Sequence, residues 1–498
     1  MKVPVSANLL DDESDDEPRA VGAEVTGALA KRMEELRDER WLVPVLESAL
    51  AKMTGAKPGV DGCEIEYCKI KPNRDINVSL RVRVSGLAGP EPVSQRLACT
   101  LFPSAEACRN KGEDAERRTA SDAAPQRLAR AGFVRALAVL EDPGVIVRAF
   151  PDDPALPGLA PATDEFEMLP LLADRLEVCR SGHLVPVGFT HEILHYKPRR
   201  SCAIHYKVDL ASASGTRTTC VRVFGKLARD ERGLRNCELL TAAWQASLAS
   251  NGLWLAARPV DYVPDWRLLL QEAVPGRDFR LVFAELAPDD PDAAQTERAG
   301  PLIDSIAWAI RGLQAAPIPP RSAQMSFERL LAAQERNLHY MAQLQPRLAA
   351  EVSALRAEVA RQEGKTRRGP LVFAHGDFAH GNVLIQENSV GIIDFDKAGA
   401  AEAVYDVAYF LTHMWSFGIR HPRRMPHVAR LWQRFRDCYL GLAPEVSPAR
   451  LSLYEALDFA GYVLRNFRKQ SHQPGWLTWA NGQVDAAWER LGLSSKDA

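Results

Sequence analysis

The pattern of apolar and polar residues predicts two groups of short β-strands. Within each group, apolar and β-branched residues alternate with polar ones or form short continuous runs, and Gly or Pro residues separate the segments. The first group occupies 64–70, 76–84, 96–102 and 144–149, and the second occupies 191–196, 202–210, 219–224 and 266–273. We therefore expect two β-rich regions, one after the other.

Helical spacing of apolar residues fills much of the remaining chain. Segments 23–52, 125–140 and 230–249 are rich in Ala and Leu, and their apolar residues recur at helical spacing. From about residue 295 nearly all of the chain reads as helix, apart from short strands near residues 371–393. Strand groups followed by a long helical region predict an α+β fold.

The two strand groups resemble each other in sequence. KPNRDINVSLRV at 71–82 aligns with KPRRSCAIHYKV at 197–208, and LACTLFPS aligns with TCVRVFGK further along. GVIVRAFPDD aligns with RLLLQEAVPG, and the offsets all lie between roughly 122 and 126 residues, as expected of a duplicated unit. This alignment places Ser104 opposite Lys226. Chance similarity of short strand–turn–strand segments is the alternative explanation.

Composition narrows the class of protein. The 498 residues carry a net charge of −2, so no basic field indicates nucleic-acid binding. No apolar run approaches the roughly 18 residues of a membrane-spanning helix, and the N-terminus lacks the apolar core of a signal peptide. The nine cysteines lack C-x-x-C spacing and predict reduced thiols in a cytoplasmic protein. The acidic stretch within residues 1–22 predicts a disordered tail.

Residues 371–396, LVFAHGDFAHGNVLIQENSVGIIDFD, hold the most informative side chains. Asp377 follows an apolar strand and is placed to orient a substrate hydroxyl and accept its proton. His375 belongs to the same catalytic loop, and we expect it to brace the loop by hydrogen bonds more than to transfer protons. Asn382 and Asp394 offer the oxygen ligands that Mg²⁺ prefers. Asp396 is either a further metal ligand or a turn residue.

This spacing resembles a known family of kinases. Protein kinases carry H-R-D-x-x-x-x-N and D-F-G, whereas this chain has H-G-D-x-x-x-x-N and D-F-D. The H-G-D form is similar to the aminoglycoside phosphotransferase/choline kinase family, and the resemblance covers about residues 185–490. It implies that Asp406 opens a helix and holds the catalytic loop. Many members have a His two residues after the catalytic Asp, but here Ala379 stands there. His380 follows it, where an exposed loop side chain is the usual outcome.

The resemblance also implies a bilobal, protein-kinase-like fold with a β-rich N-lobe and a mostly helical C-lobe. Its N-lobe residues would bind ATP. Lys226 would neutralise the phosphates, paired with Glu238 or, as the alternative, Glu231. Arg199, Arg200 and Ser201 would supply donors in a phosphate-covering hairpin, with a basic hairpin exposed to water as the alternative, and Glu272, Ala273 and Val274 would form an adenine-binding hinge.

Together these features predict four regions. They are a tail at 1–22, an α+β accessory domain at 23–180 that would be a degenerate N-lobe duplicate, an N-lobe at 181–280 and a helical C-lobe at 281–498. The predicted activity is transfer of the γ-phosphate of ATP, with Mg²⁺, to a hydroxyl of a small molecule. Aminoglycosides, choline-like amino alcohols, sugars and amino-acid hydroxyls all stay open as acceptors. The alternative is a kinase-like nucleotide-binding scaffold without catalysis. Because H-R-D, D-F-G and A-P-E are missing, a protein kinase ranks last.

Overall fold

The computed structural model describes residues 23–71, 74–87, 89, 91–118, 126–180, 182–212, 218–286, 294–320, 322–386, 389–470 and 475–493. The predicted tail at 1–22 lies outside these residues. The chain divides into two compact units, each described by itself below. The first contains Glu13–Arg235 and Val260–Glu272, and the second contains Asn236–Pro259 and Ala273–Ala498. The predicted α+β class, with sheets followed by a mostly helical region, is confirmed.

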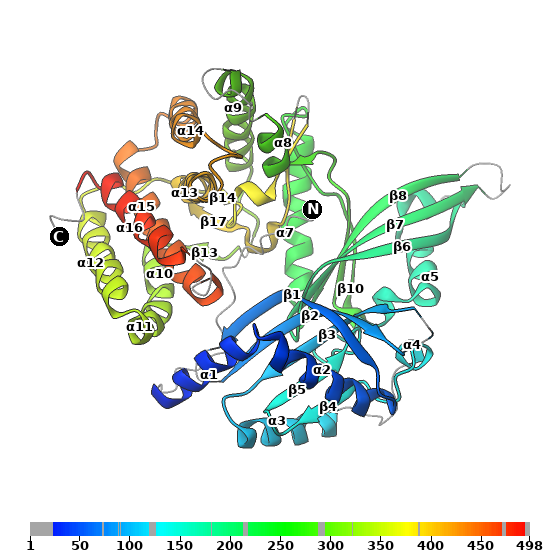
Figure 1. The fold of residues 1–498 in the computed structure, drawn as a ribbon. Helices are drawn as coiled ribbons and strands as arrows, with labels where there is room; N and C mark the ends of the chain where they lie inside the picture. Colours follow the sequence, from blue (N-terminus) through cyan, green and yellow to red (C-terminus); the bar gives the residue numbers. More distant parts are fainter. Residues whose placement is uncertain are drawn as a thin grey trace. The chain divides into compact units, whose positions relative to one another are not determined.

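The first unit is built on two five-stranded antiparallel sheets (Figure 1). The first sheet has the order β1-β2-β3-β5-β4, and the second has the order β6-β7-β8-β11-β10. The strands of the first sheet are β1 (Gly59–Lys71), β2 (Asp75–Ser85), β3 (Val93–Leu101), β4 (Leu137–Leu140) and β5 (Val145–Ala149). Those of the second are β6 (Leu184–Lys197), β7 (Ser201–Ser212), β8 (Thr218–Ala228), β10 (Pro259–Val263) and β11 (Leu268–Glu272).

Helices accompany both sheets, and one follows the third strand in each case. In the first unit they are α1 (Ala23–Glu35), α2 (Glu39–Thr54), α3 (Ala105–Arg118), α4 (Gln126–Arg130), α5 (Glu165–Arg175) and α6 (Glu177–Arg180). Helix α7 (Arg232–Leu248), which follows β8, begins in the first unit and belongs mostly to the second. The predicted helix at 23–52 is therefore two helices, because Asp38 caps α2 by accepting from the Arg40 N–H. The predicted helix at 125–140 is wrong, since only a short helix forms there before β4.

The two sheets agree in strand order and in most of their register, although a second bulge lies at Ile65/Tyr67 in the first hairpin and at Ile193/His195 in the second, two residues away from the common offset. Lys71 pairs with Asp75 in the first hairpin, and Lys197 pairs with Ser201 in the second, at an offset of 126 residues. Both hairpins carry a bulge between pairs that correspond at this same offset, Val60/Gly62 in the first and Pro186/Gly188 in the second. β-Bulges are specific local features that are conserved within protein families, so a bulge at the same place in both hairpins is not expected by chance. The shared geometry favours duplication, which stays our interpretation.

The strand register corrects the sequence alignment of the third strands, and with it the residue that corresponds to Lys226. Leu101 pairs with Ile76 in the first sheet, and Leu227 pairs with Cys202 in the second, so the third strands keep the offset of 126 residues. Lys226 therefore corresponds to Thr100 and not to Ser104. Thr100 donates its hydroxyl to Asn77 Oδ1 at 3.4 Å. A short polar side chain thus stands where the second sheet has a lysine.

Each sheet has its own apolar core. Helices α1 and α2 share one apolar core with the first sheet, in which α1 contacts β2 and α2 contacts β1 and β4. The segment 156–179, which contains α5 and most of α6, packs on the second sheet. Tyr206 lies in that core and donates its hydroxyl to the Ala162 carbonyl at 2.7 Å. The segment between the two sheets is therefore a structural part of the second one.

The second unit is mostly helical. Its two small sheets have the orders β12-β15-β16-β9 and β13-β17-β14. The strands are β9 (Trp254–Ala256), β12 (Arg277–Asp278), β13 (Gln324–Met325), β14 (Leu371–Ala374), β15 (Val383–Ile385), β16 (Val390–Ile392) and β17 (Gly399–Glu402). The helices are α8 (Phe279–Glu285), α9 (Ala294–Gln314), α10 (Phe327–Ala333), α11 (Glu335–Leu344), α12 (Pro346–Glu363), α13 (Val404–Arg420), α14 (Val428–Leu442), α15 (Pro448–Gln470) and α16 (Trp476–Arg490).

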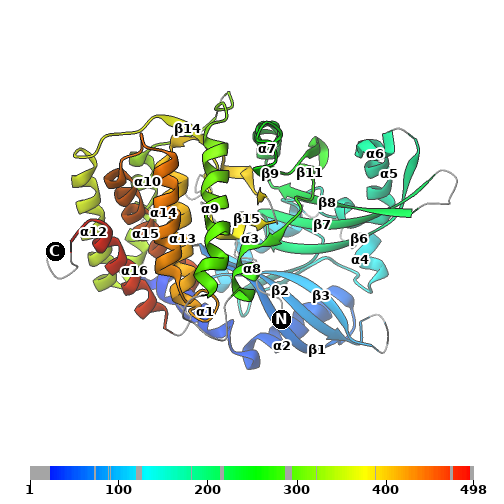
Figure 2. The same cartoon turned by 90° about the horizontal axis from the view of Figure 1, so that it is seen from above.

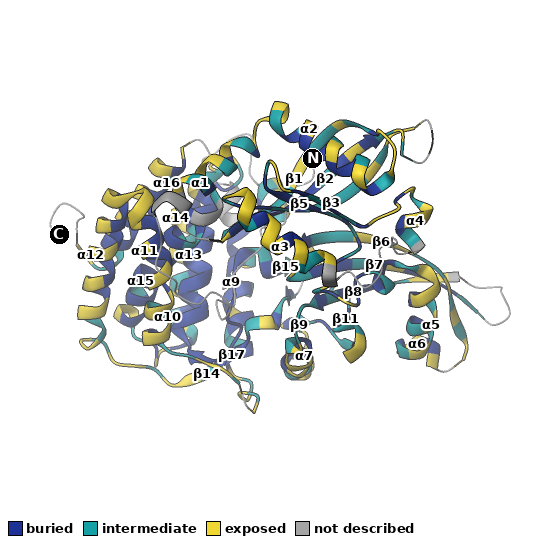
Figure 3. Cartoon of the chain, turned by 90° about the horizontal axis from the view of Figure 1, so that it is seen from below, coloured by how far each residue is buried: buried dark blue, intermediate teal, exposed yellow. Residues whose placement is uncertain are grey.

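Helix α13 lies at the centre of this unit. Its sequence is apolar on nearly all sides, which is typical of a buried helix, and most of its residues are buried (Figure 3). Helices α9, α13 and α14 lie next to one another (Figure 2). In the described part of the chain, no helix combines the length and apolar character needed to cross a bilayer.

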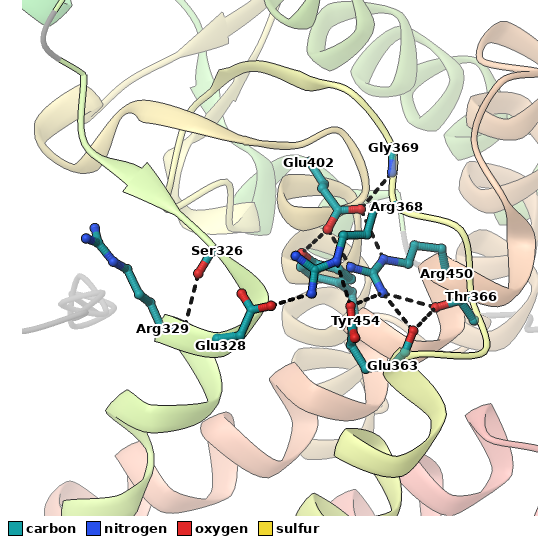
Figure 4. Close-up of polar contacts among 10 residues, drawn as sticks. All are labelled: Ser326, Glu328, Arg329, Glu363, Thr366, Arg368, Gly369, Glu402, Arg450 and Tyr454. Carbon is teal, nitrogen blue, oxygen red and sulfur yellow. Dashed lines mark hydrogen bonds and ion pairs between the residues drawn. The ribbon is translucent and has the colours of Figure 1, made fainter.

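A buried ion network joins α12, β17 and α15 (Figure 4). Arg450 is 1% exposed and forms two bonds with Glu402, at 3.0 and 2.6 Å. It also bonds Glu363 and Thr366, each at 3.0 Å, while the Tyr454 hydroxyl donates to Glu402 at 2.8 Å. Burial acts to raise the pKa of Glu402, but these partners outweigh it and lower that pKa. The network fixes the chain between α12 and β14.

Candidate active site

The site begins at the end of a short strand whose last two residues are buried. Strand β14 delivers the chain into His375, Gly376 and Asp377. Gly376 has φ +81°, and a Cβ there would lie 2.1 Å from the Lys397 carbonyl oxygen. Only glycine fits at this point, because the left-handed conformation and the close approach both exclude a side chain.

Asp406 holds this loop from α13. Its Oδ2 accepts the His375 N–H at 2.6 Å, and its Oδ1 accepts the Gly376 N–H at 2.9 Å. Burial raises the pKa of Asp406 to about 7, the two N–H donors act against this, and the charge of Asp377 adds to it. The Tyr405 hydroxyl donates to the Gly376 carbonyl at 3.2 Å. Asp406 therefore opens α13 and holds the loop, as the family resemblance implied.

His375 joins the loop to the second acidic segment. Its Nδ1 accepts the Asp377 N–H at 3.2 Å, and its Nε2 lies 3.0 Å from the Ile393 carbonyl. The ring also packs against Phe395, with 4.7 Å between the ring centres. Both ring nitrogens contact the backbone, which is the geometry that a bracing role requires. Proton transfer by His375 stays a prediction.

One carboxylate oxygen of Asp377 has a hydrogen-bond partner, and the other has none among the described residues. The residue is 1% exposed, and its Oδ2 lies 3.0 Å from Lys397 Nζ. Its Oδ1 is buried and has no hydrogen-bond partner among the described residues. Buried polar atoms are normally paired, so an exception at a catalytic position calls for an explanation. Asn382 Nδ2 donates to the Asp377 backbone carbonyl at 2.9 Å, which fixes the loop beyond it.

Lys397 was not predicted from the sequence. It follows Asp394 by three residues in a turn, where a lysine is usually solvated. Its role appears only in the fold, because its partner Asp377 is 20 positions away. The D-F-D-K run itself carried no signal that distinguished this lysine from any other.

The predicted metal ligands lie at one end of the β15–β16 hairpin. Val383 pairs with Ile392, and the Ile393 N–H donates to the Asn382 carbonyl at 3.0 Å, so Asn382 and Asp394 are neighbours across the strands. Asp394 has φ +73°, an uncommon conformation for a residue with a side chain. Its side chain is half-buried.

These side chains fit a hard cation such as Mg²⁺ in chemistry. They offer carboxylate and amide oxygens, and Mg²⁺ is usually held by one or two such groups together with waters and substrate phosphates. Asp396 is exposed in the adjoining turn, which leaves its two predicted roles open. Among the described residues, no cluster of three or more His, Cys, Asp or Glu side chains that could hold a metal by itself occurs.

His380 differs from expectation. It is buried instead of exposed, and its ring lies 4.9 Å from Phe417 and 6.0 Å from Phe279, measured between ring centres. Burial lowers the pKa of His380 to about 3, with a smaller contribution from the charge of Arg280. The ring is therefore neutral at physiological pH. It packs within the aromatic core of the unit instead of in solvent.

The predicted ATP-binding residues fall in both units. Ser201, Lys226 and Glu272 lie in strands of the second sheet of the first unit, and Arg200 lies in the turn between β6 and β7. Lys226 lies in β8 and pairs with Ala203 and Leu269. Glu238, Ala273 and Val274 belong to the second unit, and Glu238 is exposed on α7. A Cβ on Gly391 would lie 2.7 Å from Val274 Cγ1, so Val274 packs on β16, the strand that leads to Asp394.

Comparison with known proteins confirms the family resemblance. Residues 217–444 match the family model described as the phosphotransferase enzyme family, so residues 23–180 lie outside the match. This supports the kinase-like α+β fold and a phosphotransferase activity. No curated protein matches the chain.

Solved structures whose backbones follow a similar path include kinases that act on small molecules. A choline/ethanolamine kinase family protein from Mesorhizobium loti has a TM-score of 0.39 at 14% identity, covering 66% of this chain and 94% of that one. Aminoglycoside phosphotransferase APH(4)-Ia, in complex with AMP-PNP and hygromycin B, has a TM-score of 0.43 at 13% identity, covering 65% and 98%. The enzyme APH(3'')-Id from Streptomyces rimosus, with ADP and streptomycin, has a TM-score of 0.33 at 19% identity, covering 50% and 89%.

Proposed function

We propose that this protein transfers the γ-phosphate of ATP to a hydroxyl group of a small molecule. The match of residues 217–444 to the phosphotransferase enzyme family supports the reaction class. The observation that carries the proposal is the buried Oδ1 of Asp377, which has no partner among the described residues while Lys397 holds Oδ2. An acceptor hydroxyl is the kind of donor that this oxygen lacks.

In the proposed reaction the acceptor hydroxyl donates its hydrogen bond to Asp377 Oδ1. As the hydroxyl oxygen attacks the γ-phosphorus, its proton passes to Asp377, and the bond to the bridging β,γ-oxygen breaks to release ADP. Asp377 mainly orients the nucleophile, because positioning and charge stabilisation dominate phosphoryl transfer. Lys397 keeps the carboxylate in one rotamer, which leaves Oδ1 as the accepting atom.

The remaining predicted residues have binding roles in this proposal. Asn382 and Asp394 would hold Mg²⁺, which supplies charge neutralisation on the phosphates, with Asp396 as a further candidate ligand. Lys226 and the hairpin residues Arg200 and Ser201 would contact phosphates. Glu238 would orient the lysine, and Glu272, Ala273 and Val274 would bind the adenine through backbone groups.

The test is a panel of hydroxyl acceptors with ATP consumption as the signal, run on the wild type and on Asp377→Asn. We expect the variant to lower kcat by roughly 10²–10⁴ while leaving nucleotide affinity and the melting temperature close to wild type. The control is Asp304→Asn, which removes a surface carboxylate of α9 that pairs with Arg434 of α14 and should leave kcat unchanged. Turnover of Asp377→Asn near the wild-type value would reject the assignment.

The same panel separates catalysis from the scaffold alternative. A protein that binds ATP in calorimetry, but transfers phosphate neither to any acceptor nor to water, would be a nucleotide-binding scaffold. Transfer to one acceptor class would also identify the substrate, which the family match alone leaves open.

A further inference from the structure

The hairpin between β6 and β7 has an unusual loop for a phosphate-covering position. It runs from Lys197 to Ser201 without a glycine, and Arg199 takes the left-handed conformation with φ +60°. A residue with a Cβ adopts this conformation only at a cost in free energy, so something must stabilise it. The Arg200 N–H closes the turn by donating to the Lys197 carbonyl at 3.0 Å.

The stabilising group comes from outside the hairpin. Asp153 lies in the segment after β5, and its Oδ2 accepts the Arg199 N–H at 2.7 Å and the Tyr196 hydroxyl at 2.8 Å. Its Oδ1 accepts the Ala155 N–H at 3.1 Å, which fixes the carboxylate in its own turn. One side chain therefore helps to stabilise the conformation of a loop that begins more than forty positions later in the sequence.

Asp153 is too deeply buried to be an ordinary surface turn residue. It is 5% exposed, and burial raises its pKa even though three hydrogen bonds act in the opposite direction. Burying a carboxylate is costly unless donors surround it, and here two of the three donors belong to the hairpin. A free-energy cost of this kind is expected where the conformation of the loop serves a function besides the stability of the fold.

We propose that Asp153 is a positioning residue for nucleotide binding, which holds the β6–β7 hairpin in the conformation that receives the phosphates. This inference rests on the proposed function, in which Arg200 and Ser201 contact the nucleotide. A glycine-rich loop must be ordered when it binds, whereas this loop is ordered beforehand. Preorganisation of this kind increases affinity because fewer groups lose freedom on binding. The accessory region thereby acts on a binding loop that lies outside it in sequence.

The main variant is Asp153→Ala in the full-length protein, with Asp164→Ala as the matched control. Asp164 lies in the same segment and caps α5 by accepting the Phe166 N–H, so its loss removes a hydrogen bond without touching the hairpin. We measure the dissociation constant of a non-hydrolysable ATP analogue by calorimetry, the KM of the acceptor, and hydrogen exchange of the backbone amides of Arg199 and Arg200.

We expect Asp153→Ala to weaken binding of the analogue by about tenfold, to speed exchange at Arg199, and to leave the acceptor KM at the wild-type value. Asp164→Ala should change none of these. Because Asp153→Ala leaves a small cavity, Tyr196→Phe serves as a second variant. It keeps the ring packing, removes one of the two bonds from the hairpin to the carboxylate, and should give a smaller loss in the same direction.

Equal analogue affinity in the wild type and in both variants would overturn the proposal, as would faster exchange at Arg199 without any loss of affinity. If Asp153→Ala does not fold, the result for Tyr196→Phe decides. Failure of the wild type to bind the analogue at all would reject the proposed function and this inference with it. Binding by the wild type without a difference between the variants would reject the inference alone.

Discussion

The substitution Asp406→Asn tests how Asp406 supports the catalytic loop, apart from its effect on the stability of the fold. The asparagine keeps the shape of the side chain but has one oxygen, so it can accept from either His375 or Gly376 and not from both. The amide NH₂ then faces the other backbone N–H. Loss of one hydrogen bond to a charged group costs about 1.5–3 kcal/mol. The loop should therefore move at the residue before Asp377, where a displacement of about 1 Å can lower the rate by roughly 10².

The same substitution removes a buried charge. Burial raises the pKa of Asp406 to about 7 from the ordinary 3.8, and at 1.36 kcal/mol per pH unit this corresponds to about 4 kcal/mol. A raised pKa in the folded state means that the favourable contribution of this group is complete below pH 3.8 and is lost as the pH rises through about 7. At pH 8 the relief of the buried charge offsets the lost hydrogen bond. We expect the free energy of unfolding to stay within about 2 kcal/mol of wild type, while kcat falls by roughly 10–10².

The assay combines denaturant unfolding between pH 4 and pH 8 with kcat for an acceptor identified in the panel. Glu455→Gln is the matched control. Glu455 is also a buried carboxyl whose pKa burial raises to about 7, but it bonds Trp432 and Arg436 and lies away from the catalytic loop in sequence and contacts. Its kcat should stay at the wild-type value. A kcat for Asp406→Asn within about threefold of wild type would refute the reasoning, because the loop would then not depend on both bonds.

Two further substitutions test the second unit. Gly376→Ala places a Cβ 2.1 Å from the Lys397 carbonyl oxygen at a residue with φ +81°, so kcat should fall by at least about 10². The control is Gly441→Ala in α14, whose Cβ meets nothing within 4 Å and should raise helix stability slightly. Equal activity in both variants would contradict the close approach at Gly376. Arg450→Met leaves Glu402 buried without its cation and should lower the free energy of unfolding by about 3–5 kcal/mol in urea titration. Adding Glu402→Leu to Arg450→Met should recover part of that loss, and a purely additive double variant would show that the two side chains are not coupled.

The sequence predicted the strands well because their signal is local. Alternation of apolar and polar residues places β2 and β7 within a few residues of their observed ends, and the loop of H-G-D and D-F-D was identified from spacing alone. The segment 125–140 failed because its Ala and Leu residues suit a helix and a buried strand equally, and only packing beside β5 decides that Leu137–Leu140 is a strand. Register also needs pairing partners, so the alignment of the third strands was wrong by four residues.

Residues that act through distant partners could not be predicted. Lys397 reaches Asp377 across 20 positions, and Asp153 reaches Arg199 across 46. Neither has a neighbour in sequence that distinguishes it from a solvated side chain. The burial of His380 is of the same kind, because the aromatic rings around it come from α8 and α13. Asp406 was the exception, because the family resemblance predicted that it contacts the catalytic loop, which is distant in sequence and which the local pattern alone could not predict.

The segment between the sheets limits how this chain can change over evolutionary time. Residues 156–179 supply part of the apolar core of the second sheet, and Asp153 supplies hydrogen bonds to its first hairpin. A gene deletion that ended at residue 180 would expose that core to water and remove the carboxylate. The second sheet therefore depends on the segment before it, and a shorter chain without that segment would need other groups to cover its core.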